Sequence, residues 1–258
     1  MITNGMKTKM QTGEPVVGVF VSIESPTTVE LLAHAGVDFV MVDSEHNAIT
    51  AGDAINMYRA AEALGVPALT RIGENTQQVI SKFMDAGSRG VMMPMINSGE
   101  DAERLVSYVK YPPVGRRGLA AVRANEYGML GPMGDYVTAA NDATAVVAQI
   151  ETLEGIENAD AIINTPGVDI IFLGPTDLSV ALGVPGEGKH EKVLDVITDL
   201  TKKIVAAGKV SGTIARTPED YGFWRDRGVG FFLTGANALL GAATTAYVQA
   251  TKAIEEGR

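Results

Sequence analysis

Acidic, basic and imidazole side chains follow short apolar runs of this 258-residue chain, at the point where each run ends. One run ends in Asp43-Ser44-Glu45-His46, a later one ends in Arg71, and another ends in Gln149-Ile150-Glu151. A further run continues into Gly174-Pro175-Thr176-Asp177. Side chains of these types can transfer protons, bind an anionic substrate or coordinate a hard cation. Their positions predict chemistry wherever the ends of these runs meet.

Two of these carboxylates, Glu151 and Asp177, follow neighbouring apolar runs, so they can converge on one cation. Two oxygen ligands, in a chain without cysteine and with one histidine nearby, suit Mg²⁺ or Mn²⁺. Water and substrate would complete the octahedron. The same positions also suit acidic residues that stabilise the first turn of a helix through its dipole. Spacing alone leaves both interpretations open.

Three other residues have two interpretations each. His46, one of three histidines, lies beside Asp43 and Glu45, where a carboxylate can tune it as a general base, although a structural histidine is the alternative. Arg71 ends an apolar run, where a guanidinium needs an anion, either a substrate oxygen or a structural carboxylate. Asp85 closes the third predicted helix, so we expect it at the opposite end of the fold from His46. It is then structural or acts across a subunit interface.

Eight apolar runs that alternate with helical patterns are expected to position these side chains. The runs are hydrophobic on both faces, as are strands covered on both sides. Gly36, Gly65, Gly87 and Gly208 stand between a helical stretch and the next run, as helix-terminating glycines do. Eight strands with crossover helices in about 250 residues favour a single (β/α)₈ TIM barrel over a doubly wound sheet. The predicted strands are Val16–Ile23, Phe39–Asp43, Pro67–Arg71, Gly90–Pro94, Ala145–Ile150, Ile170–Leu173, Val210–Ile214 and Phe231–Thr234.

One stretch, Tyr111–Asn141, interrupts this alternation. It contains three prolines, five glycines and the basic residues Arg116, Arg117 and Arg123. A long structured loop at such a place is usually functional.

The composition limits the class of protein. With 31 acidic and 21 basic residues the formal net charge is −10, which argues against binding to nucleic acid or to an anionic membrane. The absence of cysteine excludes disulfides, thiolate metal sites and cysteine nucleophiles. Lysines lie on predicted helices, in loops or before a strand, which disfavours Schiff-base chemistry. Met1–Glu14 is polar and no apolar run is long enough to span a membrane, so we expect a soluble, cytoplasmic protein with one domain over residues 1–258.

The site motifs also resemble those of a known family. Asp43-x-Glu45-His46, Arg71, Tyr111-Pro-Pro-x-Gly-x-Arg-Gly118, Gln149-x-Glu151 and Gly174-Pro-x-Asp-Leu-Ser179 occur in the family order and spacing. The chain resembles the HpcH/HpaI family of class II, metal-dependent pyruvate aldolases, which includes 4-hydroxy-2-oxoheptanedioate and 2-keto-3-deoxyglucarate aldolases. The resemblance implies a TIM barrel of the phosphoenolpyruvate/pyruvate-domain type. It also implies a homohexamer, a dimer of trimers in which neighbours exchange their last helices.

The resemblance further implies how the substrate and metal are held. Glu151 and Asp177 would bind a divalent ion, Mg²⁺ or Mn²⁺ first, with Co²⁺ or Zn²⁺ as further candidates. Arg71 would contact the pyruvate oxygen. Gln149 and the backbone at Thr176 and Asp177 would help to hold pyruvate.

The resemblance also implies a reaction, the reversible aldol cleavage of a 4-hydroxy-2-oxo acid to pyruvate and an aldehyde. His46, supported by Asp43 and Asp85, would remove the proton of the C4 hydroxyl. The C3–C4 bond would then break and leave a pyruvate enolate, stabilised by the metal and Arg71. The enzyme would be an aldehyde-lyase whose partners are small molecules.

Three alternatives differ in the ligand. A citrate-lyase-type enzyme would cleave a 3-hydroxyacyl-CoA thioester on the same fold, but it needs a basic nucleotide surface that this acidic chain hardly offers. A barrel with a phosphate site after strands seven and eight could use Arg216 and Thr234–Asn237, although no glycine-rich cradle is evident. A non-catalytic, metabolite-binding barrel is disfavoured by the complete set of reactive groups at the strand ends.

Overall fold

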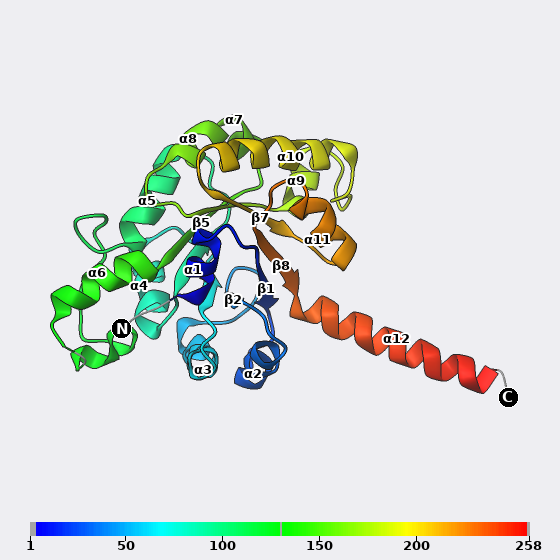
Figure 1. Cartoon of the computed structure of the whole chain (residues 1–258), viewed down its shortest axis with the longest axis horizontal. Coiled ribbons are helices and arrows are strands. Elements are labelled where there is room, and N and C mark those ends of the chain that lie inside the picture. Colours follow the sequence, from blue (N-terminus) through cyan, green and yellow to red (C-terminus); the bar gives the residue numbers. More distant parts are fainter. Residues whose placement is uncertain (1–3, 130, 257–258) are drawn as a thin grey trace.

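The computed structural model describes residues 4–129 and 131–256, and its eight parallel strands close into a barrel (Figure 1). Each strand pairs with the next along the chain, and β8 pairs with β1 to complete the ring. The expected (β/α)₈ TIM barrel is confirmed. The strands are β1 (Val16–Val21), β2 (Phe39–Asp43), β3 (Ala68–Arg71), β4 (Gly90–Met93), β5 (Ala145–Ile150), β6 (Ile170–Leu173), β7 (Val210–Ile214) and β8 (Phe231–Gly235).

Helices alternate with the strands and cover most of the outside of the barrel (Figure 1). Within the described ranges, none of them is both long and apolar enough to cross a lipid bilayer. The helices are α1 (Gly5–Gln11), α2 (Pro26–His34), α3 (Ala51–Ala63), α4 (Gln77–Ala86), α5 (Gly99–Val109), the 3₁₀ helix η1 (Arg123–Gly128), α6 (Met133–Ala143), α7 (Leu153–Glu157), α8 (Ala159–Asn164), α9 (Pro175–Ala181), α10 (Glu191–Ala206), α11 (Pro218–Arg225) and α12 (Ala236–Glu256).

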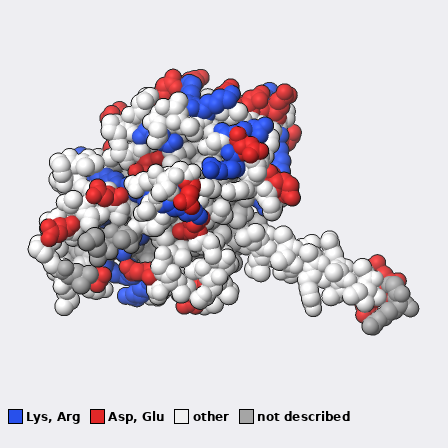
Figure 2. Space-filling view, viewed as in Figure 1, with Lys and Arg blue, Asp and Glu red and all other residues white. Residues whose placement is uncertain are grey.

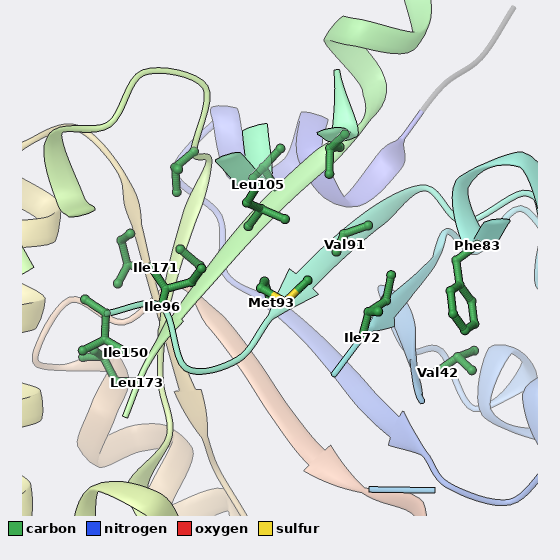
Figure 3. Close-up of a cluster of buried hydrophobic side chains, with 14 of the residues drawn as sticks. Val42, Ile72, Phe83, Val91, Met93, Ile96, Leu105, Ile150, Ile171 and Leu173 are labelled. Atoms are coloured by element: carbon green, nitrogen blue, oxygen red, sulfur yellow. The ribbon is translucent and has the colours of Figure 1, made fainter. Parts of the chain in front are cut away.

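Two hydrophobic cores hold the barrel. The outer core lies between strands and helices, where Phe83 of α4 and Leu105 of α5 are buried together with the outward-facing side chains of the strands (Figure 3). The inner core fills the barrel, and the rings of Phe39 and Phe231 stack in it with centroids 4.5 Å apart. Buried methionines of α1 join this inner core, so α1 closes the amino-terminal end of the barrel. The predicted site residues follow the other, carboxyl-terminal ends of the strands.

Local sequence signals place the helix ends. Thr50 and Asp53 form a capping box at the start of α3. The four glycines expected to end helices all adopt positive φ, between 72° and 121°. At Gly87 a side chain would also collide with the guanidinium of Arg123, so only glycine fits there.

Several details differ from the sequence prediction. Strand β3 begins at Ala68 instead of Pro67, β4 ends at Met93 instead of Pro94, and β8 ends at Gly235 instead of Thr234. The first strand ends at Val21, because Ile23 already belongs to a turn in which its carbonyl accepts the N–H of Ser25, the N-cap of α2. The stretch predicted as irregular, 111–141, contains η1 and most of α6, and its residue 130 lies outside the described residues. Helix α1 was not predicted. The predicted domain, 1–258, also includes residues 1–3 and 257–258, which lie outside the described ranges.

The last helix projects away from its own barrel (Figure 1). Of its described residues only Ala236, at its start, is buried. In a TIM barrel the eighth helix covers the face between the last and first strands. Here Val17, on that face of β1, keeps 39% of its surface exposed. The chain by itself therefore leaves one position of the helical ring open.

Candidate active site

The carboxyl-terminal end of the barrel brings together the predicted side chains of β2, β3 and β5. Alternate residues of a strand point to the same side. Met41 and Leu69 belong to the inner core, so Asp43 and Arg71, two residues further on, also face the inside. Gln149, on the inward side of β5, is buried at the same end. The expected meeting of polar groups at this end is thus observed.

The guanidinium of Arg71 is held by two carboxylates. Its Nε and Nη2 donate to the two oxygens of Asp43 at 2.8 Å each, and its Nε lies 3.2 Å from Oε2 of Glu45. The ring of Phe20 packs against it, 4.4 Å from Cζ to the centroid. Burial disfavours the charge of Arg71, but the hydrogen bonds and charge of Asp43 outweigh it and raise the pKa of Arg71. Arg71 therefore forms a structural ion pair with Asp43 and Glu45 through its Nε and Nη2, and its Nη1 takes no part in these contacts.

The carboxylate of Glu151 is fixed by neutral donors. The backbone N–H of Met95 donates to its Oε1 at 2.9 Å, and the side-chain amide of Gln149 donates to its Oε2. Met95 has φ of 50°, an uncommon conformation outside glycine, and it directs this N–H toward the carboxylate. At Gly174 an added Cβ would lie 2.9 Å from Oε2, so a side chain there would press on the carboxylate. Both oxygens of Glu151 are thus oriented.

Glu151 carries its charge in an unfavourable environment. The residue is only 4% exposed, and no lysine, arginine or histidine of the described chain lies within ion-pair distance of it. Burial raises its pKa to about 7, and the nearby carboxylates of Asp177 and Glu45 contribute to this rise. A cation among these carboxylates would reverse the effect.

The donor set fits a divalent cation that also uses substrate and water as ligands. Glu151 and Asp177 supply two carboxylates, and Oε1 of Gln149 is a buried acceptor with no hydrogen-bond partner. Across the described residues, no group of three or more histidine, aspartate and glutamate side chains is placed to hold a metal ion by itself. Hard cations of the Mg²⁺ type commonly use one or two protein carboxylates and complete their shell with water and substrate oxygens.

His46 lies at the rim, with 62% of its side chain exposed. The carboxylate beside it is Glu45, whose Oε2 lies 3.7 Å from Nε2 of the imidazole. Asp43 instead contacts Arg71 and accepts from Asn47 at 2.8 Å. The sequence offered Asp43 or Glu45 as the carboxylate beside His46, and the family resemblance implied Asp43; the residue that the structure places there is Glu45. Its position directly before His46 at the end of a strand was the available signal.

Asp85 is not brought to His46 within one chain. It lies in the last turn of α4 and accepts from Nη2 of Arg117 at 2.6 Å. The buried guanidinium of Arg117 also packs on the ring of Tyr111, 4.6 Å from its centroid. Arg123 donates to the backbone oxygen of Ala86 at 3.0 Å in the same region. These arginines of the 111–141 stretch therefore lie away from Glu151 within the chain.

Thr176 and Asp177 open α9 directly after β6, as predicted for a helix start at this end of the barrel. Both residues are exposed. The hydroxyl of Ser179 donates to the carbonyl of Thr176 at 2.5 Å and stabilises the first turn. The backbone N–H groups at the start of this turn are free to meet an anion.

A model of the family described as HpcH/HpaI aldolase/citrate lyase matches residues 16–238. The chain belongs to this family. The match begins with β1, ends in α12, and contains every site residue described above.

Several relatives of the chain are named aldolases. The hydroxypyruvate/pyruvate aldolase of Paraburkholderia phytofirmans is 34% identical over 244 residues, which cover 92% of this chain and 93% of that protein. The 2-dehydro-3,6-dideoxy-6-sulfogluconate aldolase of Pseudomonas putida is 36% identical over 215 residues, 83% of each chain. The solved HpcH/HpaI aldolase of Desulfitobacterium hafniense has a TM-score of 0.89 at 30% identity, and 95% of this chain and 96% of that chain align. The expected class, an aldolase acting as a carbon–carbon lyase, is confirmed.

The citrate-lyase alternative is supported only by the fold. Two solved structures named citrate lyases share 16% and 15% identity with this chain, at TM-scores of 0.63 and 0.54.

Proposed function

We propose that this aldolase cleaves a 4-hydroxy-2-oxo acid reversibly to pyruvate and an aldehyde, with a divalent metal ion. The observation that carries the proposal is the environment of Glu151. It is a buried carboxylate oriented by Gln149 and Met95 and close to Asp177, and no basic side chain among the described residues forms an ion pair with it. Such a carboxylate is costly for a fold unless it binds a cation.

Glu151 and Asp177 are the proposed metal ligands, and Mg²⁺ or Mn²⁺ best suits their oxygens, with Co²⁺ or Zn²⁺ as further candidates. When bound, the ion supplies positive charge that stabilises the negative oxygen of an enolate. Gln149 and the backbone N–H groups of Thr176 and Asp177 are proposed to hold the carboxylate of the pyruvate half.

Arg71 is proposed to stabilise the same oxygen from another side. Its two hydrogen bonds to Asp43 fix the plane of the guanidinium, so its remaining N–H groups are pre-oriented toward the substrate. A donor of this kind contributes most where charge develops during the reaction, typically a few kcal/mol.

His46 is the proposed base. Its imidazole accepts the proton of the C4 hydroxyl, and the O–H electron pair becomes the new carbonyl bond of the aldehyde. The electrons of the broken C3–C4 bond form the C2–C3 double bond of the enolate, which becomes pyruvate when C3 takes up a proton. Oε2 of Glu45 lies 3.7 Å from Nε2 of this imidazole, and Asp85 is proposed to act across a subunit interface.

The exposed α12 supports the proposed homohexamer with exchanged last helices. The only charged residues of α12 lie near its end and are Lys252, Glu255 and Glu256. Figure 2 shows the rest of this helix nearly free of charged side chains. Its apolar side chains, such as Leu240 and Tyr247, which is 72% exposed, would be covered by a neighbour. We further propose that residues 1–258 form one aldolase domain and that the protein is cytoplasmic.

The test is a pyruvate-release assay over a panel of 4-hydroxy-2-oxo acids. The protein is stripped with EDTA and then supplied with Mg²⁺, Mn²⁺, Co²⁺ or Zn²⁺. We expect no pyruvate without metal and release from at least one acid with metal. Undiminished activity in EDTA would refute the metal, and cleavage of a 3-hydroxyacyl-CoA thioester alone would favour the citrate-lyase alternative.

A further inference from the structure

We propose that Asn97 positions the carboxylate of Glu151 for metal binding, by holding the backbone N–H of Met95 on one of its oxygens. Asn97 acts through the backbone two residues before it, so it is a positioning residue and not a ligand. The inference rests on the proposed function where it concerns the metal, because Glu151 is the proposed ligand that Asn97 would orient.

The backbone of Met95 has a conformation that its own side chain does not hold in place. Its φ is 50°, in the left-handed region, where residues other than glycine are strained. Its side chain is 57% exposed, so packing of that side chain contributes little to fixing the backbone. Such a conformation persists only where the surrounding contacts enforce it. The residues on either side of Met95 must therefore supply those contacts.

The chain on both sides of Met95 is anchored to β5. Met93, the last residue of β4, pairs with Ala148 of β5. The N–H of Ile96 donates to the carbonyl of Gln149 at 3.0 Å, and the side chain of Ile96 is buried in the outer core (Figure 3). These anchors bring the loop to β5. The φ of Met95 sets the direction in which the chain leaves it, so that angle depends on where the following residues are held.

Asn97 is the residue that fixes this direction, because it contacts three neighbouring elements. Its Oδ1 accepts from the hydroxyl of Thr152 at 2.5 Å, and Thr152 directly follows Glu151 in the chain. Its carbonyl oxygen accepts from Nδ2 of Asn158, at the end of α7, at 2.8 Å. Its N–H donates to Oδ2 of Asp101 in α5 at 3.3 Å. We refer to the side chains of Asn97, Thr152 and Asn158 as the clasp.

The first turn of α7 is built to receive Asn97. Thr152 is the N-cap of α7, and its Oγ1 accepts the N–H of Gly155 at 3.0 Å. The hydroxyl proton of Thr152 is therefore available to Oδ1 of Asn97. At Gly155 an added Cβ would lie 2.8 Å from the carbonyl oxygen of Ile96, so a side chain there would push α7 away from the loop. Glycine at this position thus permits the contact on which the clasp depends.

The clasp affects Glu151 through the N–H of Met95. That N–H donates to Oε1 at 2.9 Å, and the side-chain amide of Gln149 donates to Oε2. Without the clasp, Met95 can relax to a negative φ. Because Ile96 stays anchored to β5, that change rotates the N–H of Met95 away from Oε1. Glu151 then loses one of the two donors that orient it, and groups that orient a metal ligand typically contribute about 10- to 100-fold in affinity.

Hydrogen–deuterium exchange with mass spectrometry tests the clasp without metal and without turnover. In EDTA, a peptide with the amides of Met95 and Ile96 should be protected in the wild type and exchange about tenfold faster in Asn97→Ala. Thr152→Ser keeps the hydroxyl and should match the wild type. Asn164→Ala removes an exposed asparagine side chain of α8 outside the clasp and should also match it. Unchanged protection in Asn97→Ala would overturn the inference.

Mn²⁺ binding, followed by electron paramagnetic resonance of the free ion, tests the consequence for the site. We expect Asn97→Ala to raise the Kd of Mn²⁺ about tenfold, and Thr152→Ser and Asn164→Ala to leave it unchanged. Glycine adopts a positive φ without strain, so adding Met95→Gly to Asn97→Ala should restore most of the affinity. A clasp that only stabilises the fold would give faster exchange with an unchanged Kd. That result, or no recovery in the double variant, would overturn the inference.

Glu151→Gln separates the inference from the proposed function. We expect this variant to bind Mn²⁺ more weakly than the wild type does. Equal Mn²⁺ binding by the two proteins would refute Glu151 as a metal ligand. Faster amide exchange in Asn97→Ala would, even then, support the part of the inference in which Asn97 holds the N–H of Met95.

Discussion

Replacing Glu151 by glutamine should stabilise the metal-free protein at alkaline pH, although it removes a proposed metal ligand. The pKa of Glu151 is raised from 4.5 to about 7, chiefly by burial. Between these values the native protein binds more protons at this site than the unfolded chain does, so the free energy of unfolding falls as the pH rises. Above pH 7 the full cost of the buried charge is present.

The expected difference in the free energy of unfolding follows from the pH range between the two pKa values of Glu151, 4.5 in the unfolded chain and about 7 in the native protein. A difference of about 2.5 pH units at about 1.4 kcal/mol each gives about 3 kcal/mol. Glutamine removes this cost and can keep the local contacts. Its carbonyl accepts from Met95, and its amide can donate to Oε1 of Gln149 once that side chain turns, an oxygen that otherwise has no partner.

Urea denaturation of both proteins in EDTA, at equal protein concentration and at several pH values, measures this difference. We expect Glu151→Gln to equal the wild type near pH 4.5 and to exceed it by about 3 kcal/mol at pH 8. Glu154→Gln changes an exposed glutamate of α7 and should differ from the wild type at neither pH. Excess Mg²⁺ should stabilise the wild type and not the Glu151 variant. A Glu151→Gln protein that is less stable than the wild type at pH 8, or a difference independent of pH, would refute the reasoning.

Three further predictions concern other groups. His46→Ala should reduce aldol cleavage far more than proton exchange at C3 of pyruvate, and equal losses in the two assays would show that His46 does not act on the C4 hydroxyl. Burial lowers the pKa of Lys110 to about 8, so above pH 8 the unfolded chain binds more protons at this residue than the native protein does. The free energy of unfolding of the wild type should therefore rise by about 2 kcal/mol between pH 8 and 9.5. In urea denaturation, Lys110→Met should not show this rise. Sedimentation velocity should show a hexamer for the wild type and smaller species for Leu240→Asp on the exposed face of α12, whereas a monomeric wild type would contradict the exchange of helices.

The barrel and the composition of its rim were predictable because both follow from short-range patterns. β2, β5, β6 and β7 have the predicted bounds. The first three are wholly or nearly apolar runs between turn signals, and β7 begins and ends with an apolar residue. The polar residues that end these runs could be assigned to one rim, because parallel strands in a barrel all end on the same side.

Features that depend on contacts distant in the sequence were not predictable. The pairing of Arg71 with Asp43 joins residues 28 positions apart, and it shows that Asp43 orients Arg71 rather than contacting His46. The N–H of Met95 reaches Glu151 only because the backbone at Met95 has a positive φ. Glycine is the only residue type that predicts such a backbone from sequence, so this contact could not be foreseen at a methionine. The helical part of the 111–141 stretch was hidden by its prolines and glycines, which favour a loop assignment.

Deuterium exchange at the C3 methyl group of pyruvate, followed by proton NMR in D₂O, tests the central claim most directly. The claim is that Glu151 and Asp177 bind a divalent ion with which the site forms the enolate of pyruvate. We predict exchange by the wild-type protein with Mg²⁺ or Mn²⁺, no exchange after treatment with EDTA, and none by Asp177→Asn, whose fold should be retained. Exchange at the full wild-type rate in EDTA, or by the Asp177 variant, would contradict the account.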